Sequence, residues 1–122
     1  MNQKPVLSRQ NLATYFQGEQ FVRDTISQMN KDLGGLDTIS PTEDFYSLQD
    51  KLQSLIQLIA PVLEKLAHHA GDQLAQFIYR VDVSEQNFLR CMSALQPYEY
   101  LAEQVIQRCA QKVYLRIKFS QK

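Results

Sequence analysis

Apolar residues recur at steps of three and four along most of this chain, and this spacing constrains the fold more than any other feature of the sequence. Such steps place side chains on one stripe of an α-helix. The clearest stripe consists of Phe45, Leu48, Leu52, Leu55, Ile59, Val62 and Leu66. Strand signals are scarce, because Val, Ile and Thr occur singly and no Asn-Gly or Asp-Gly turn joins two β-rich runs. The pattern therefore predicts an all-α fold.

The first predicted helix runs from about Ser8 to Leu33. Gly18 weakens its middle by about 1 kcal/mol relative to alanine, so a bend or a frayed turn is expected there. Gly34 and Gly35 end the helix, because glycine readily adopts the left-handed conformation that follows many helices. Its apolar stripe consists of Leu12, Tyr15, Phe16, Val22, Ile26, Met29 and Leu33.

The second predicted helix has the strongest start signal in the chain. Ser40 is the expected N-cap, Pro41 fits the first helical position, and Glu43 completes a capping box. Pro61 lies inside the apolar pattern and removes a backbone donor, which predicts either a kink in the preceding turn or a break into two helices. Gly71 is expected to end this element.

Three shorter helices are predicted after residue 71. Asp72 is the expected N-cap of the first, Ser84 caps the second after a brief link at residues 82–83, and Pro97 starts the last. The expected inward residues are Leu74, Phe77, Ile78 and Val81 in the first, Phe88, Leu89, Met92 and Leu95 in the second, and Leu101, Val105, Ile106, Cys109, Val113 and Ile117 in the last.

The expected architecture is a helical bundle of four to five helices. A long N-terminal helical hairpin, formed by the two long helices, is predicted to pack with the shorter C-terminal helices. A chain of 122 residues fits one α-helical domain spanning residues 1–122, since a core of this size buries roughly two-thirds of the unfolded surface.

The charge balance bears on the class of partner. Lys plus Arg equals 13 and Asp plus Glu equals 13, whereas nucleic-acid-binding proteins are usually basic, so a nucleic-acid partner is disfavoured. The C-terminal residues Arg108, Lys112 and Arg116 nevertheless recur every four residues beside Tyr114. This basic stripe is a candidate interaction surface, and one alternative function is a nucleic-acid accessory protein that uses it. The other interpretation is a solvated helix end whose charges complement the helix dipole.

Glu64, His68 and Asp72 are the best candidates for a metal or acid–base site. Glu64 and His68 lie four residues apart on one helix face, but no second histidine cluster supplies further ligands and the HExxH pattern is absent. No GxSxG, Walker A or GxGxxG motif occurs either. The prediction is therefore a chain without catalytic, cofactor-binding or metal-ligating residues, with a metal-dependent enzyme around Glu64, His68 and Asp72 as a second alternative.

The two cysteines, Cys91 and Cys109, lack CxxC spacing and lie on predicted apolar helix faces, where thiols are inert. Such free cysteines fit a reducing compartment. No stretch approaches the roughly 20 apolar residues that span a bilayer, and residues 1–5 carry no apolar run suited to a secretory signal. These observations predict a cytoplasmic protein with no membrane partner.

Residues 77–85, Phe-Ile-Tyr-Arg-Val-Asp-Val-Ser-Glu, follow a leucine-rich helix that ends at His69 and precede the late Gln111-Lys112-Val113. Over roughly residues 55–117 this arrangement resembles a set of small uncharacterised bacterial proteins. The resemblance implies an all-helical cytoplasmic protein and brings no activity or binding residue. Together with the amphipathic helices, the resemblance leads to the hypothesis of a non-enzymatic structural or protein-interaction module. This module is expected to form a homodimer or another homo-oligomer, or to bind another protein.

Overall fold

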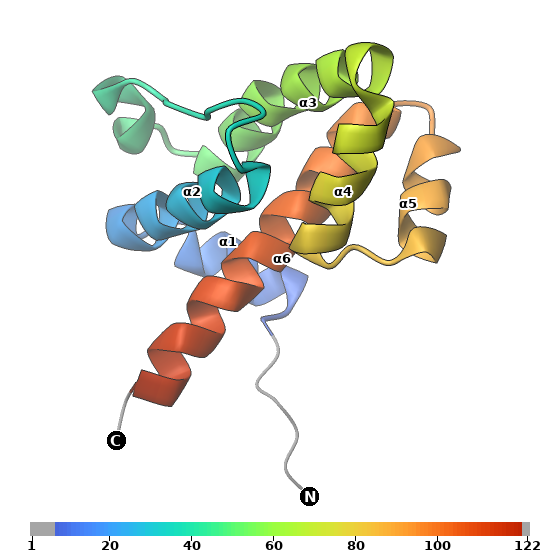
Figure 1. The fold of residues 1–122 in the computed structure, drawn as a ribbon. Coiled ribbons are helices and arrows are strands. Elements are labelled where there is room, and N and C mark those ends of the chain that lie inside the picture. The colour runs from blue at the N-terminus through green and yellow to red at the C-terminus, as the bar shows by residue number, and fades with distance from the viewer. Residues whose placement is uncertain (1–6, 121–122) are drawn as a thin grey trace, which may run out of the picture.

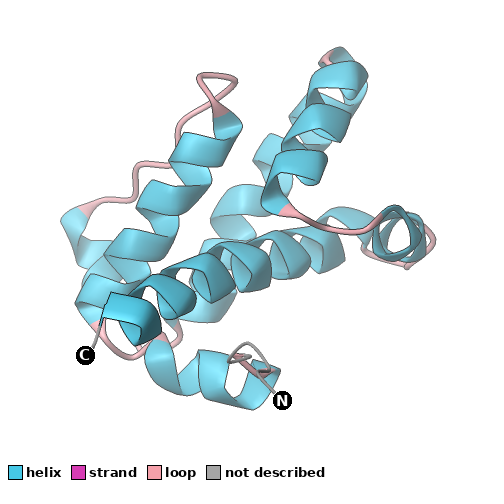
Figure 2. Ribbon diagram, turned by 60° about the horizontal axis from the view of Figure 1, so that its bottom comes forward, coloured by secondary structure: helices cyan, strands magenta, loops and turns pink. Residues whose placement is uncertain are grey.

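The computed structural model describes residues 7–120, and these form α-helices and one short 3-10 helix without any strand (Figure 1 and Figure 2). The elements are α1 (Arg9–Tyr15), α2 (Glu19–Leu33), η1 (Glu43–Ser47), α3 (Lys51–His69), α4 (Gly71–Val81), α5 (Glu85–Met92) and α6 (Pro97–Ser120). The all-α prediction is confirmed, although the described residues form more helices than the four to five expected. Within residues 7–120, no helix is both long and apolar enough to cross a membrane.

Helix α6 is the element against which most of the others pack. Figure 1 shows it crossing the molecule between α2 on one side and α4 and α5 on the other, and α3 also packs against it. Its buried residues are Leu101, Ala102, Val105, Ile106, Cys109, Ala110 and Val113. They form two adjacent stripes, so α6 buries apolar surface against several helices at once. Helices α2 and α3 both pack chiefly against α6, whereas the predicted hairpin would have packed them against each other.

The predicted helix over residues 8–33 is divided at Gly18, which has an extended conformation with φ −84° and ψ 121°. On a continuous helix, Phe16 and Phe21 would point about 140° apart. The break instead buries both rings, with 6.1 Å between their centroids. The predicted end of this segment is confirmed, since Gly34 adopts the left-handed conformation with φ 59° and its N–H donates to the carbonyl of Asn30.

The predicted start of the second long helix at Ser40 is wrong. Asp50 caps α3, because its carboxylate accepts a hydrogen bond from the backbone N–H of Gln53 at 3.0 Å. Residues 43–47 form η1 instead. The carboxylate of Glu43 binds Arg23 of α2 at 2.7 Å and therefore does not complete a capping box. Tertiary contacts hold this segment outside the helix, since the side chain of Asn30 in α2 forms two hydrogen bonds with the backbone of Ile39 and Phe45 is buried.

Helix α3 continues through Pro61, so the predicted break into two helices is wrong. The helix ends at His69, and Ala70, with φ −153° and ψ 54°, separates it from α4. Gly71 is the first residue of α4 and does not end α3 in the way that the sequence predicts. Asp72 lies in the first turn of α4, where its charge favours the helix dipole, and it is not the N-cap.

The later boundaries agree with their local signals. Asp82 ends α4 in the left-handed conformation with φ 75° and forms the predicted brief link together with Val83. The hydroxyl of Ser84 accepts a hydrogen bond from the backbone N–H of Asn87 at 3.1 Å, which confirms Ser84 as the N-cap of α5. Pro97 is the first residue of α6, as predicted.

The predicted apolar face of α5 is confirmed only in part, since Phe88 and Met92 pack against the core whereas Leu89 and Leu95 do not. Cys91 is its fully buried residue, whereas Leu89 is 58% exposed and Leu95, which follows the helix, is fully exposed. Helix α5 packs against α6. Side chains two positions apart on a helix point in nearly opposite directions, so burial of Cys91 turns Leu89 toward solvent.

We predict opposite effects of alanine at two glycines. Gly34→Ala should lower the free energy of unfolding by about 1–2 kcal/mol, because φ 59° is strained for residues with a Cβ. Gly71→Ala should raise it by up to about 1 kcal/mol, since no atom lies within 4 Å of the added Cβ and alanine favours the helix. Urea denaturation measures both changes, and equal destabilisation by the two substitutions would contradict these backbone assignments.

Candidate functional site

The predicted basic stripe faces α2 and α4 and forms contacts within the chain. Arg108 forms an ion pair with Asp82 at the end of α4. Lys112 donates to the carboxylate of Asp32 and to the backbone carbonyl of Arg80, at 2.9 Å in each case. One turn later, Arg116 donates to the side-chain oxygen of Gln28 at 2.5 Å. The three cations therefore connect α6 to its neighbours.

Asp32 is the centre of these contacts and is only 8% exposed. Besides Lys112, its carboxylate accepts a hydrogen bond from the side-chain amide of Gln28 at 3.2 Å. The backbone carbonyl of Asp32 accepts a hydrogen bond from Nε of Arg80 at 2.6 Å, so Arg80 caps the last turn of α2. We call Gln28, Asp32, Arg80 and Lys112 the α2–α4–α6 junction. Its polar groups are paired, as burial requires.

Tyr114, the aromatic residue of the basic stripe, is also engaged. Its ring packs edge-on against Tyr15 with 5.4 Å between centroids. The ammonium group of Lys118 lies 5.5 Å from the centre of the same ring. Stacking of a nucleic-acid base on Tyr114 would have to displace these contacts, which reduces the support for the basic stripe as a nucleic-acid surface.

Glu64, His68 and Asp72 are all exposed. The His68 ring lies 6.3 Å from the ring of Tyr98, measured between centroids. Across residues 7–120, no group of three or more His, Cys, Asp or Glu side chains could hold a metal ion. Glu64 instead lies beside Pro61 on the rim of a surface hollow. The geometry offers no convergence of these residues on a common ligand.

Cys91 and Cys109 are free and buried. Burial raises the pKa of the Cys109 thiol, and the nearby carboxylate of Asp32, whose oxygen lies 3.9 Å from the sulfur, raises it further. Burial also raises the pKa of Cys91. A thiol with a raised pKa is a poor nucleophile, so neither cysteine has the properties of a catalytic residue.

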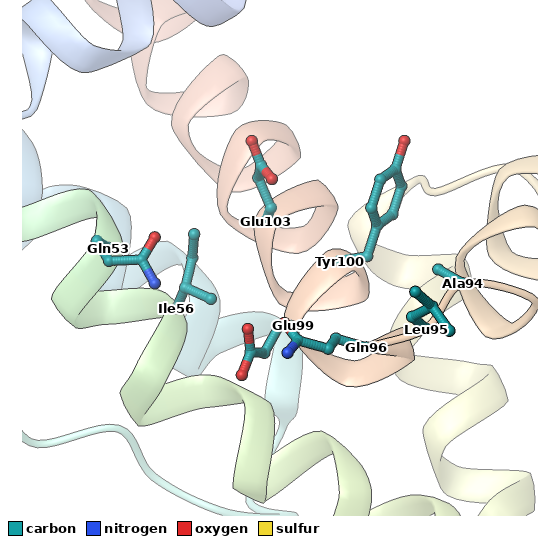
Figure 3. A pocket seen from close by; sticks show the side chains of 8 residues that line it. All are labelled: Gln53, Ile56, Ala94, Leu95, Gln96, Glu99, Tyr100 and Glu103. Atoms are coloured by element: carbon teal, nitrogen blue, oxygen red, sulfur yellow. The ribbon is translucent and has the colours of Figure 1, made fainter.

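A concave surface runs between α3 and the N-terminal half of α6, and we call it the α3–α6 groove. It consists of three adjoining hollows of about 380, 440 and 380 Å³. Gln53 and Ile56 line two of the hollows, while Leu95 and Glu99 line the first and the third. Figure 3 shows Gln53 and Ile56 on one side of the first hollow and Glu99 on the other. The shared walls make the groove continuous.

A separate hollow of about 350 Å³ lies between α4 and α5, and apolar side chains line almost all of it. We call it the α4–α5 patch, formed by Ala75, Ile78, Tyr79, Val83, Glu85, Phe88 and Leu89. Tyr79 is 84% exposed and Leu89 is 58% exposed, so its rim presents a large aromatic and a large aliphatic side chain to solvent. Sequence reasoning took Leu89 as core and therefore missed this surface. Phe88, Leu89 and Met92 fall within about 100° of one another on a helix, so their spacing gave no signal that Leu89 would be exposed.

Comparison with protein-family models, curated proteins and solved structures found no match to this chain. The resemblance of residues 55–117 to small bacterial helical proteins therefore stays a prediction.

The α2–α4–α6 junction predicts that one lysine of the basic stripe is structural. Lys112→Met should lower the free energy of unfolding by about 2 kcal/mol, because it leaves the buried carboxylate of Asp32 without its cation. Lys112 is partly solvated, so the loss of stability is smaller than for a fully buried ion pair. Lys118→Met, on the same helix, should change it by less than about 0.5 kcal/mol. Thermal and urea denaturation test the difference, and equal stabilities of the two variants would refute the structural role.

The raised thiol pKa of Cys109 predicts a pH dependence. In the unfolded chain the thiol ionises near pH 8.5, whereas in the folded chain it stays protonated well above that value. Stability contributed by this residue is therefore present below about pH 8.5 and falls as the pH rises further. Ultraviolet absorbance of the thiolate, followed against pH in Cys91→Ala protein, measures this directly. Ionisation of the native thiol near pH 8.5 would contradict the burial argument.

Proposed function

We propose that this chain is a non-enzymatic protein-interaction module that self-associates as a homodimer through the α4–α5 patch. The single observation that carries the proposal is the exposure of Tyr79 and Leu89 beside an apolar hollow. Covering large apolar side chains contributes about 25 cal/mol for each Å² removed from water. Contiguous exposed apolar surface of this kind marks interaction sites on many proteins.

The apolar lining of the patch favours a second copy as the occupant, because Glu85 is the one charged residue among the described residues that line it. A twofold axis across the middle of α5 would pair two α5 helices antiparallel. This arrangement brings Leu89 toward the apolar hollow of the second copy. Such an interface is isologous, as in most homodimers, and the formal net charge of zero adds no overall repulsion.

The other two functions have less support. Binding of nucleic acid would use Arg108, Lys112 and Arg116, but all three already contact groups within the chain. A metal-dependent enzyme would need Glu64 and His68 to act with further ligands, and both are exposed. The cytoplasm of a bacterium is the proposed setting, because both cysteines are free and the resemblance of residues 55–117 points to bacterial proteins.

The homodimer predicts that removing one apolar contact separates the copies. Leu89→Asn should shift the protein from dimer to monomer in sedimentation or light scattering, since the exposed leucine contributes to the interface and little to the core. Leu58→Asn is the matched control, because Leu58 is also an exposed leucine, 41% accessible, but lies on α3 away from the patch. A strictly monomeric parent protein would refute self-association.

A further inference from the structure

The α3–α6 groove has the dimensions of a docking site for a helix. Its α3 wall extends from Gln53 to Glu64, along one face of the helix. At 1.5 Å per residue this wall is about 16 Å long, which equals about three helical turns. Grooves of this length accept the apolar face of an amphipathic helix, whose anchoring side chains are spaced by three or four residues.

The groove presents Leu95 as an exposed apolar anchor above a largely buried apolar floor. Ile56 lies in its floor, shared by two hollows. Leu95 lines two hollows and is fully exposed, because it lies between α5 and α6, where no helix covers it. Phe16 and Ala60 line the two ends but are buried, at 2% and 8% exposed, so they add little accessible surface. An occupant with apolar side chains on one face would cover Leu95.

The charges of the groove determine the kind of helix. Asp50 lies at one end, Glu99 in the middle and Glu64 at the other end, whereas Lys51 is the one cation among the described residues that line the groove. Glu64 and Glu99 form no ion pair with another described residue. From this complementarity we infer that the α3–α6 groove binds a cationic amphipathic helix of another protein. Nucleic acid and anionic lipid surfaces are disfavoured there, since carboxylates repel phosphate groups.

The groove and the α4–α5 patch are lined by different residues, so the two surfaces act independently. A homodimer formed through the patch would carry two grooves. Each dimer would then hold two cationic helices, which raises the effective affinity for a partner that presents them in pairs.

The test uses the full chain and a synthetic helical peptide about three turns long, with leucine on one face and lysine on the other. Fluorescence anisotropy should detect binding that weakens as salt rises, because the attraction is partly electrostatic. Glu64→Lys/Glu99→Lys should weaken binding by at least about tenfold. The control variant is Asp44→Lys/Asp72→Lys, which changes the net charge by the same amount at positions outside the groove. Asp72 matches Glu99 because both lie in the first turn of a helix. This control should weaken binding by less than about twofold.

A pair of leucine variants separates the groove from the homodimer. Leu95→Asn should abolish peptide binding and keep the dimer, whereas Leu89→Asn should abolish the dimer and keep peptide binding. Leu95 is fully exposed, so its substitution has little effect on folding. Three results would each overturn the inference. The first is equal binding by the parent chain and Leu95→Asn, and the second is absence of binding by the parent chain. The third is equally tight binding of a peptide that carries glutamate in place of lysine.

Discussion

Burial of α6 among α2, α3, α4 and α5 is the constraint on which the rest of the structure depends. Its two adjacent apolar stripes meet helices on several sides, and small residues such as Ala102 and Ala110 let those helices approach closely. The basic residues lie beside these stripes and reach the flanking helices. Lys112 thereby neutralises the buried carboxylate of Asp32 and connects α6 to α2, while Arg108 connects it to α4. The positive charges of the C-terminal helix are thus used mainly within the fold.

The outer surfaces follow from what α6 cannot cover. Helix α5 has only 8 residues and buries Cys91 against α6, so Leu89 on its other side remains in water. Between α5 and α6 the chain exposes Leu95, and the space between α3 and α6 stays open as a groove. One surface is largely apolar, and the other combines the exposed Leu95 with carboxylates. These two surfaces carry the proposed binding to a second copy and to a cationic helix.

The sequence predicted those features that depend on local chemistry. Gly34, Ser84 and Pro97 mark helix ends because glycine conformation, hydroxyl capping and the proline ring act within a few residues. Ser40 is not a cap, because tertiary contacts of Ile39 and Phe45 hold the segment before α3 outside the helix. The spacing of apolar residues predicted the apolar helix faces, but it could not show which of these faces a neighbouring helix covers. The groove and the patch therefore emerged only from the tertiary arrangement, and Glu64, singled out from the sequence for metal binding, lies on the rim of the groove.

Hydrogen exchange of backbone amides, recorded at low and high protein concentration, tests this account most directly. Amides of residues 101–113 should exchange most slowly at both concentrations, because they lie at the centre of the fold. Added protection at high concentration should be confined to residues 75–90, which contain the α4–α5 patch. Slowest exchange in α2 or α3 would contradict the central role of α6. If the amides of Arg108, Lys112 and Arg116 exchanged more slowly at high protein concentration, the conclusion that the basic stripe forms contacts within the chain would be contradicted.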